Sequence, residues 1–189
     1  MKKLIMLAAC VMMAAGVYAQ EFEFGVKGGL NFATMTNVDH AKMKPSFHLG
    51  GFAEYTINEF VGIQGEALYS RQGFFMKEGG AKKWCRYNYL NIPVLAKLYL
   101  IEGLSLDLGP QFGILLNAKE RWKAGGESGT NDIKDAKNFD VSFPIGLSYK
   151  ITPRFDVSAR YVLGLTEVES VGDEKFKNSV IQVGVGYRF

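Results

Sequence analysis

Apolar and polar residues alternate along most of the chain. In the stretch IQVGVGYRF, from Ile181 to Phe189, every second residue is bulky and apolar, and those between are polar or glycine. Strict alternation is typical of a β-strand whose two faces meet different surroundings. The pattern predicts eight strands, within residues 22–32, 46–57, 60–74, 89–100, 104–117, 139–151, 154–165 and 180–189.

The connections between these strands alternate in length. Tight turns are expected at Asn58-Glu59, Glu102-Gly103 and Thr152-Pro153, whereas the other joints are long and polar, at residues 34–45, 75–86, 118–137 and 167–177. Short turns at one end and long loops at the other are typical of an up-and-down membrane barrel. About ten alternating residues per strand are enough to cross a bilayer when the strand is tilted.

The composition of the two faces separates a membrane barrel from a soluble one. A soluble lipocalin-like barrel also has eight strands, but its apolar face lines a ligand cavity and its polar face meets water. Here the apolar set is the bulkier one, and the other set holds many glycines and charges of both signs, which suits a narrow interior. In lipid, strands satisfy every backbone group only in a closed barrel. The sequence therefore predicts an all-β fold, an eight-stranded antiparallel up-and-down transmembrane β-barrel.

Aromatic residues gather near the predicted tight turns. They are Phe22, Phe24, Tyr55, Phe60, Tyr149, Phe155, Tyr187 and Phe189. Rings at the membrane–water interface are typical of such barrels, so we expect a girdle at the periplasmic end. The alternative is that these rings belong to an ordinary soluble β core.

The first residues have the pattern of an export signal. Lys2 and Lys3 precede the apolar run 4–16, and Val17-Tyr18-Ala19 is a small-x-small cleavage site. We expect a cleaved signal peptide at residues 1–19 and an outer-membrane β-barrel domain at residues 20–189. Two alternatives are an uncleaved anchor helix and a lipoprotein signal at Leu7-Ala8-Ala9-Cys10. The apolar run continues past Cys10, which disfavours the second.

Charge and cysteine content narrow the function further. Removing Lys2 and Lys3 leaves 22 − 2 = 20 basic against 19 acidic residues, a net charge of +1. A nearly neutral chain gives no electrostatic reason to expect nucleic acid as a partner. Loss of Cys10 leaves Cys85 alone, which excludes an intrachain disulfide and a zinc site built on paired cysteines.

The segment YNYLNIPVLAKLYL resembles the YLxIPxLxK stretch of the PorT-like outer-membrane β-barrel family, small barrels often called the porin family. The matching residues are Tyr89, Leu90, Ile92, Pro93, Leu95 and Lys97, and FGVKGGLNFA, GEALYSRQGF and the VGVGYRF ending are also similar. The resemblance implies a barrel in a Gram-negative outer membrane, with Phe189 recognised by the barrel-assembly machinery during insertion. It implies little about activity, although one branch of the family is linked to protein secretion.

The motifs of common enzyme sites are absent from the sequence. It contains no G-x-x-x-x-G-K-[ST], no G-x-S-x-G and no H-E-x-x-H. We therefore predict no catalytic residue, no cofactor and no metal site. A lipid-modifying enzyme would need a triad such as His48, Ser70 and Asp140, and no spacing singles these out. A hydrogen-bonded role in the lumen is favoured for His48.

Charged residues on the polar face predict a structural network in the lumen. Glu54 and Glu66 lie on adjacent strands either side of the turn at 58–59, so their carboxylates need a cation between them. Lys97 is expected in that place, with Arg160 on the far side, because buried charges must be paired. The predicted network is Glu54, Glu66, Lys97, Asp107 and Arg160.

The second long loop is basic and aromatic. In FFMKEGGAKKWCRY, a surface contact with lipopolysaccharide phosphates is expected from Lys82, Lys83, Trp84 and Arg86. The alternative is a solvated loop with no partner. Cys85 is expected to be exposed there.

Three prolines conflict with regular pairing. Pro93, Pro110 and Pro144 lie inside predicted strands and lack a ladder donor. We expect bulges or gaps in the hydrogen-bond ladder at these positions.

Together these patterns predict a small integral outer-membrane protein with a structural or surface-interaction role and no enzymatic activity. One alternative is a narrow solute channel, although side chains fill the interior of an eight-stranded barrel. A second is a lipid-modifying enzyme. The expected partners are outer-membrane lipid, lipopolysaccharide, the assembly machinery and an unidentified envelope protein.

Overall fold

The computed structural model describes residues 22–36, 42–78, 81–125, 127–133, 137–166, 169–171 and 174–189. This part of the chain is all β, and no helix in it is long and apolar enough to cross a membrane. Its strands are β1 (Phe22–Thr36), β2 (Lys42–Thr56), β3 (Val61–Gln72), β4 (Phe74–Glu78), β5 (Ala81–Ile101), β6 (Leu104–Leu108), β7 (Gln111–Ala124), β8 (Glu127–Asp132), β9 (Phe139–Lys150), β10 (Phe155–Gly164), β11 (Glu169–Val171) and β12 (Glu174–Arg188). The predicted signal peptide lies outside the described residues.

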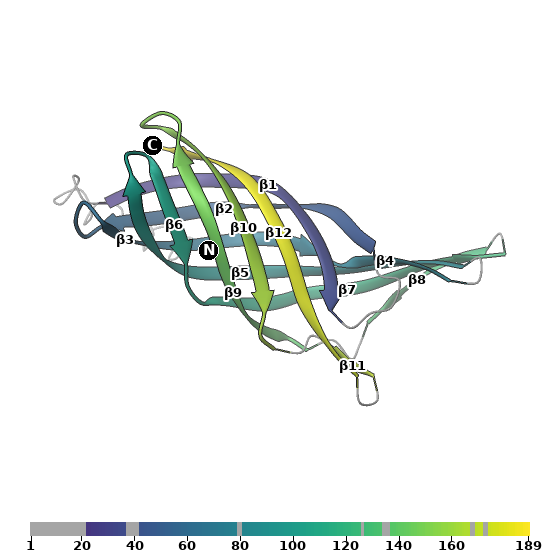
Figure 1. The fold of residues 1–189 in the computed structure, drawn as a ribbon. Helices are drawn as coiled ribbons and strands as arrows, with labels where there is room; N and C mark the ends of the chain where they lie inside the picture. Colours follow the sequence, from purple (N-terminus) through teal and green to yellow (C-terminus); the bar gives the residue numbers. More distant parts are fainter. Residues whose placement is uncertain are drawn as a thin grey trace, which may run out of the picture.

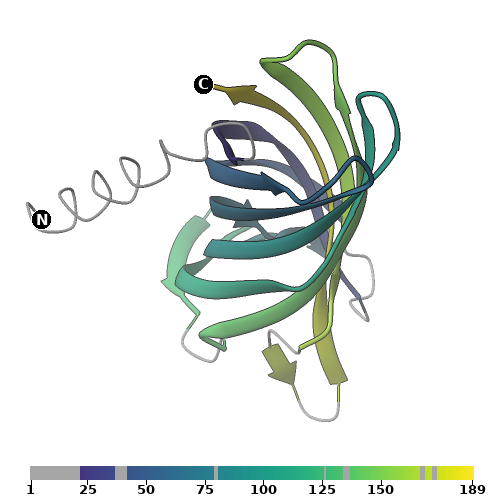
Figure 2. The ribbon, with the colours of Figure 1, turned by 90° about the vertical axis from the view of Figure 1, so that its left-hand side faces the viewer.

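The strands pair antiparallel into a closed ring. β1 to β3 and β5 follow in chain order, then β6 and β7 together, β9, β10 and β12, which returns to β1. β6 and β7 form one spanning strand interrupted at residues 109–110, and β4 continues β3 beyond Gly73. Eight spanning strands therefore curve round a lumen, as predicted (Figure 1, Figure 2).

The last strand closes the barrel. β12 pairs with β1 from Gly25↔Arg188 to Thr36↔Lys177, and with β10 on its other edge. The Phe189 amide donates to the Phe24 carbonyl oxygen at 3.0 Å. The alternation at this end of the sequence therefore reflects a strand that is paired on both sides.

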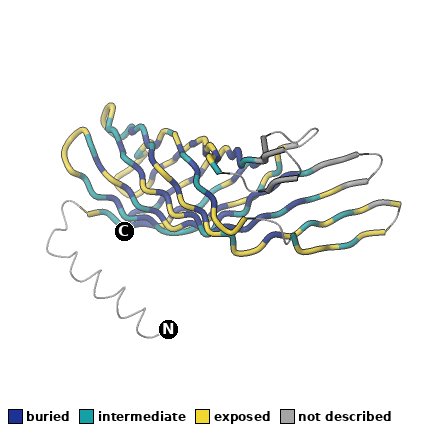
Figure 3. Tube along the Cα trace, turned by 90° about the horizontal axis from the view of Figure 1, so that it is seen from below, coloured by how far each residue is buried: buried dark blue, intermediate teal, exposed yellow. Residues whose placement is uncertain are grey.

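Burial follows the two faces of each strand. Along β3, for example, even-numbered residues are buried and odd-numbered ones are not, and Figure 3 shows the same alternation around the barrel. Polar Glu54 is 0% exposed, whereas apolar Leu49 on the same strand is 60% exposed. The polar face points into the lumen and the apolar face points outward, which confirms the membrane barrel over a soluble one.

A glycine shapes the break between β3 and β4. Gly73 has φ of 135°, which favours glycine, and a Cβ there would overlap the backbone of Cys85. The pairing with β2 shifts by one residue between His48↔Ser70 and Met43↔Phe74. This bulge bends the strand as it leaves the barrel.

Two of the expected loops, 75–86 and 118–137, are largely strands, and a third, 167–177, holds β11 and the start of β12, which pair with each other. β4 pairs with the start of β5, and the start of β5 pairs with β7, which also pairs with β8. These hairpins project beyond the barrel as a small sheet (Figure 1). The prediction of loops at 75–86 and 118–137 was wrong because a projecting sheet has no lipid face, so the apolar alternation disappears although the backbone pairs.

The prolines interrupt the ladder, as expected. Pro110 lies in the break between β6 and β7, and its carbonyl accepts from the Val94 amide at 2.9 Å. The Gly109 amide donates to the Pro144 carbonyl at 3.3 Å across the same break. Pro93 faces Gln111, and the register between β3 and β5 has a gap between Gly65↔Val94 and Leu68↔Asn91.

The aromatic residues meet at the tight-turn end, which is periplasmic in the predicted topology. The Phe22 and Tyr55 rings lie 4.6 Å apart, and those of Phe155 and Tyr187 lie 5.1 Å apart. Phe189 packs on Tyr187 at 5.8 Å. These contacts form part of the expected girdle.

Candidate functional site

The lumen nearest the tight turns holds a layer of ion pairs. Lys97 Nζ from β5 lies 3.4 Å from Glu54 Oε2 and 3.6 Å from Asp107 Oδ1. Tyr99 donates to Glu54 Oε1 at 2.7 Å. Ser105 donates to Asp107 at 2.8 Å, and Ser148 also donates to it. The hydroxyl groups thus donate hydrogen bonds to the two carboxylates in addition to the contacts made by Lys97.

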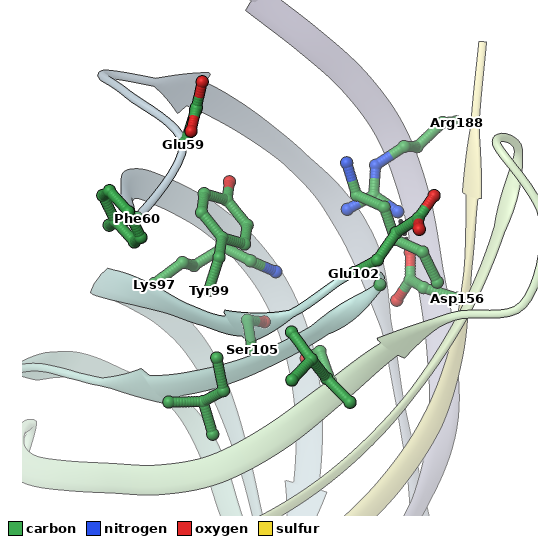
Figure 4. A pocket seen from close by; sticks show the side chains of 13 residues that line it. Glu59, Phe60, Lys97, Tyr99, Glu102, Ser105, Asp156 and Arg188 are labelled. Atoms are coloured by element: carbon green, nitrogen blue, oxygen red, sulfur yellow. Dashed lines mark hydrogen bonds and ion pairs between the residues drawn. The ribbon is translucent and has the colours of Figure 1, made fainter.

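Arg188 joins this layer to β10 and the barrel mouth. Its guanidinium bonds to Glu23 at 2.9 Å, Glu54 at 2.7 Å and Asp156 at 2.5 Å. Glycine at 186 leaves room for the Asp156 carboxylate, because a Cβ there would lie 2.5 Å from its Oδ2. Figure 4 shows Arg188 and Asp156 turned toward each other beside a pocket of about 340 Å³ at the tight-turn end.

A second layer centres on Glu66, farther along β3. Lys27 Nζ lies 3.1 Å from Glu66 Oε1, and both terminal nitrogens of Arg160 donate to the carboxylate, at 2.8 and 2.9 Å. Gln64 links the layers, because it donates to Glu66 at 2.5 Å and accepts from Lys97 at 3.1 Å.

The arrangement differs in one respect from the network expected from the sequence. Lys97 contacts Glu54 and Asp107, whereas Glu66 is held by Lys27 and Arg160. The predicted network did not include Lys27 and Arg188, because each reaches its carboxylate across an intervening strand and no predicted tight turn sets the pairing of β1 with β2 or with β12.

Farther from the tight turns the buried lumen residues are mostly uncharged polar groups, with Asp140 among them as a buried acid. His48 Nδ1 lies 2.8 Å from Asn31 Oδ1, and Asn31 donates to Ser70 at 3.0 Å. Buried polar atoms without a hydrogen-bond partner among the described residues belong to Gln72, Tyr89, Asn91, Gln111, Asn178 and Gln182. On β3, β5 and β12 these residues lie beyond the charged ones. Such groups are ordinarily satisfied by ordered water.

The structure does not assemble a triad from His48, Ser70 and Asp140. His48 and Ser70 face each other across β2 and β3, but Asp140 accepts from Thr166 at 3.0 Å and lies on β9. Among the described residues, no group of three or more His, Cys, Asp or Glu is placed to hold a metal ion.

A second candidate site lies where the barrel meets the projecting sheet. It is a groove of about 620 Å³ that we call the outer basic groove, and its lining residues are Lys44, Pro45, Ser46, Phe47, Arg71, Trp84, Arg86, Arg121 and Lys123. Five of these nine described residues are cationic and none is acidic. The Trp84 ring packs on Phe75 at 5.3 Å, and Arg71 lies 5.1 Å from the centre of the Phe47 ring.

The cations of the groove are crowded. Burial lowers the pKa of Lys44, and the neighbouring guanidinium groups of Arg86 and Arg71 lower it further. Lys44 also donates to the Cys85 carbonyl at 3.1 Å. Within the described part of the chain, Arg86, Arg121 and Lys123 form no ion pair. Cations arranged in this way attract an anion.

The residues expected to form a surface contact are divided by the sheet. Trp84 and Arg86 line the groove. Lys83 points to the opposite face and lies 2.6 Å from Glu120, and the side chain of Lys82 lies outside the described residues. Cys85 is 3% exposed and packs with Phe74, Tyr87, Tyr89 and Ala118, so the expectation of an exposed thiol was wrong. Sequence reasoning missed Lys44, Arg71, Arg121 and Lys123 because they come from three other strands.

Comparisons with known proteins agree with this architecture. The chain is similar to Ail, the attachment invasion locus protein of Yersinia pestis, with 19% identity and a TM-score of 0.55 over 89% of this chain and 99% of Ail. A structure of Ail in complex with the heparin analogue sucrose octasulfate is similar to the chain with 21% identity and a TM-score of 0.52, over the same shares of the two chains. Neisserial surface protein A is similar with 16% identity and a TM-score of 0.54, over 88% of this chain and 97% of that protein.

No curated protein matches the chain. The distant likeness to solved structures establishes the fold. Residues 4–189 match the family described as outer membrane protein beta-barrel domain. The chain therefore belongs to the outer membrane protein beta-barrel domain family.

Proposed function

We propose that this outer-membrane barrel is a non-catalytic surface-interaction protein whose plugged barrel anchors the projecting sheet at the cell surface. One observation carries the proposal: lumen cations are paired with carboxylates, whereas the outer basic groove concentrates cations without acidic neighbours. Buried paired charges serve the fold, and unpaired cations at a surface serve recognition.

The class of partner proposed is anionic. Ail, a barrel of similar fold, has been solved with sucrose octasulfate, a polyanion. For this chain the proposal stands on its own basic residues, and it includes lipopolysaccharide phosphates as the partner. Membership of the PorT-like branch and an unidentified envelope protein remain further proposals.

Export and insertion belong to the same proposal. We propose that residues 1–19 are a cleaved signal peptide and that the assembly machinery recognises Phe189. In support, Phe189 is 80% exposed at the aromatic end of the barrel, where another protein can reach it.

A solute channel is the competing function. The two layers around Glu54 and Glu66 bring side chains from β1, β2, β3, β5, β10 and β12 into contact across the lumen. These contacts leave no reason to expect an aqueous pore in so narrow a barrel.

The experiment is reconstitution of the purified mature protein in planar bilayers and in detergent. We expect different gel migration of unheated and boiled samples and no large, stable conductance. A reproducible nanosiemens-scale channel would favour the porin-like alternative. Identical migration, with extraction by carbonate, would contradict the integral barrel.

A lipid-modifying enzyme is tested separately. Folded protein incubated with lipid A and phospholipid should leave both unchanged by mass spectrometry. A modified lipid that disappears with His48→Gln would establish catalysis.

A further inference from the structure

The outer basic groove lies at the level where lipid headgroups meet the barrel. On β5 the outward residues from Leu100 to Leu90 are apolar or small, which fits the roughly 9–11 residues that a tilted strand needs to cross a bilayer. The next outward residues toward the projecting sheet are Asn88 and Arg86. On β3 the outward residue after Tyr69 is Arg71. Arg71 and Arg86 are therefore the first charged outward residues beyond the apolar band on β3 and β5.

A polar row marks this level across three strands. Arg71 Nε donates to Asn88 Oδ1 at 3.1 Å, and Asn88 Nδ2 donates to Asn117 Oδ1 at 2.6 Å. The row fixes Arg71 through its Nε, and no acceptor in the described part of the chain bonds to its terminal nitrogens. Those nitrogens are the donors that an anion in the groove would meet.

Acidic residues are available on the same sheet, but their carboxylates meet other cations. Glu120 bonds to Lys83 on the opposite face. Asp132 shares the face of the groove but lies 3.9 Å from Lys119, which stands opposite Arg86 in the ladder. Neither acid lines the groove. The positive charge there is therefore not balanced by the carboxylates of its own hairpins.

The floor of the groove continues into the lipid-facing surface. Phe47 lines the groove and is 40% exposed, and Leu49, the next outward residue on β2, is 60% exposed. A ligand with a phosphate and an adjoining acyl chain would match both surfaces at once. A soluble polyanion would match the cations alone.

We propose that the outer basic groove binds the phosphate of an outer-leaflet glycolipid, the phosphorylated lipid A of lipopolysaccharide. Arg71 and Arg86 hold the phosphate, since a guanidinium fork bonds two phosphate oxygens together. Lys44, Arg121 and Lys123 supply further charge, and Phe47 and Trp84 contact the apolar part of the lipid. This lipid site depends on the proposed surface-interaction role, and it specifies the ligand of that role.

The test uses the folded mature protein in neutral detergent with diphosphoryl lipid A and its unphosphorylated form as probes. Binding is measured by native mass spectrometry and by Trp84 fluorescence in a Trp122→Phe background. We expect the phosphorylated lipid to bind more tightly by about tenfold or more, since hydrogen bonds to charged groups are each worth about that factor.

Two variants separate the groove from general surface charge. Arg71→Gln with Arg86→Gln should weaken binding of diphosphoryl lipid A by about tenfold and leave the unphosphorylated form unchanged. Lys83→Gln removes the same type of charge from the opposite face of the sheet and should change binding by less than about twofold. Heat-dependent gel migration confirms that each variant is folded.

The outcomes distinguish this site from the wider function. Equal binding of both lipids, or binding unaffected by the double variant, overturns the lipid site. Binding of sucrose octasulfate in place of lipid A, lost in the double variant, also overturns it but preserves a surface-interaction role. If the double variant misfolds, Arg86→Lys is compared instead: a tenfold weaker affinity supports the guanidinium contact and an unchanged affinity contradicts it.

Discussion

The lumen network and the outer basic groove contain the same cationic residue types, lysine and arginine, but in different electrostatic surroundings. In the lumen, Arg160 is 5% exposed and bonds to Glu66 through two nitrogens. In the groove, Arg86 is half-buried and has no acid among the residues that line it. A cation that is buried and paired is part of the fold, whereas one left unpaired beside other cations lowers stability slightly and favours ligand binding. Substitutions in the two regions should therefore have opposite consequences.

The largest effect is expected at the centre of the lumen. Glu66→Gln keeps the size of the side chain but leaves Lys27 and Arg160 without a counter-charge. Breaking a buried ion pair in this way typically costs about 3–5 kcal/mol. The free energy of unfolding, from urea titration in detergent, should fall by about this amount. An unchanged urea midpoint for Glu66→Gln would contradict the view that lumen charges stabilise the fold and groove charges do not.

A smaller loss is expected at Lys97. Lys97→Met leaves Glu54 and Asp107 without this cation, but Arg188 still bonds to Glu54, so the cost should be near about 3 kcal/mol. The control is Lys119→Met, whose partner Asp132 lies 3.9 Å away in an exposed pair, and the change should stay below about 0.5 kcal/mol. Equal effects of both substitutions would contradict the lumen position of Lys97.

A near-neutral effect on folding is expected in the groove. Arg86→Gln relieves repulsion with Lys44, so the free energy of unfolding should change by less than about 0.5 kcal/mol and increase slightly at low ionic strength. Urea titration at two salt concentrations measures this. A loss comparable to that of Glu66→Gln would mean that Arg86 is structural.

The smallest effect concerns pH. The pKa of Lys44 is lowered in the folded protein, so between that pKa and the unfolded value of about 10.4 the unfolded chain binds more protons. Stability contributed by this group therefore rises as pH increases through that interval. The urea midpoint of the parent should therefore rise relative to that of Lys44→Met from pH 8 to pH 10. A constant difference would show that Lys44 is not crowded by its neighbours.

The sequence predicted the barrel because lipid and lumen impose opposite demands on alternate residues. It predicted the positions of Glu54, Asp107 and Arg160 on the lumen face for the same reason. It did not predict which cations contact Glu66, since Lys27 reaches it from β1 across the intervening β2, and no predicted tight turn sets the register between β1 and β2. It also missed the groove, whose residues come from β2, β3, β5 and β7 and gather only because β5 and β7 continue as paired strands beyond the membrane.

The strand pairing of the projecting hairpins has a consequence for the thermodynamics of recognition. A flexible loop loses conformational entropy when it closes on a ligand, and this loss weakens the affinity. Trp84 and Arg121 are held opposite each other in the ladder between β5 and β7 before any ligand arrives. Their ordering cost is borne during folding of the barrel, so association should be rapid and close to rigid-body docking.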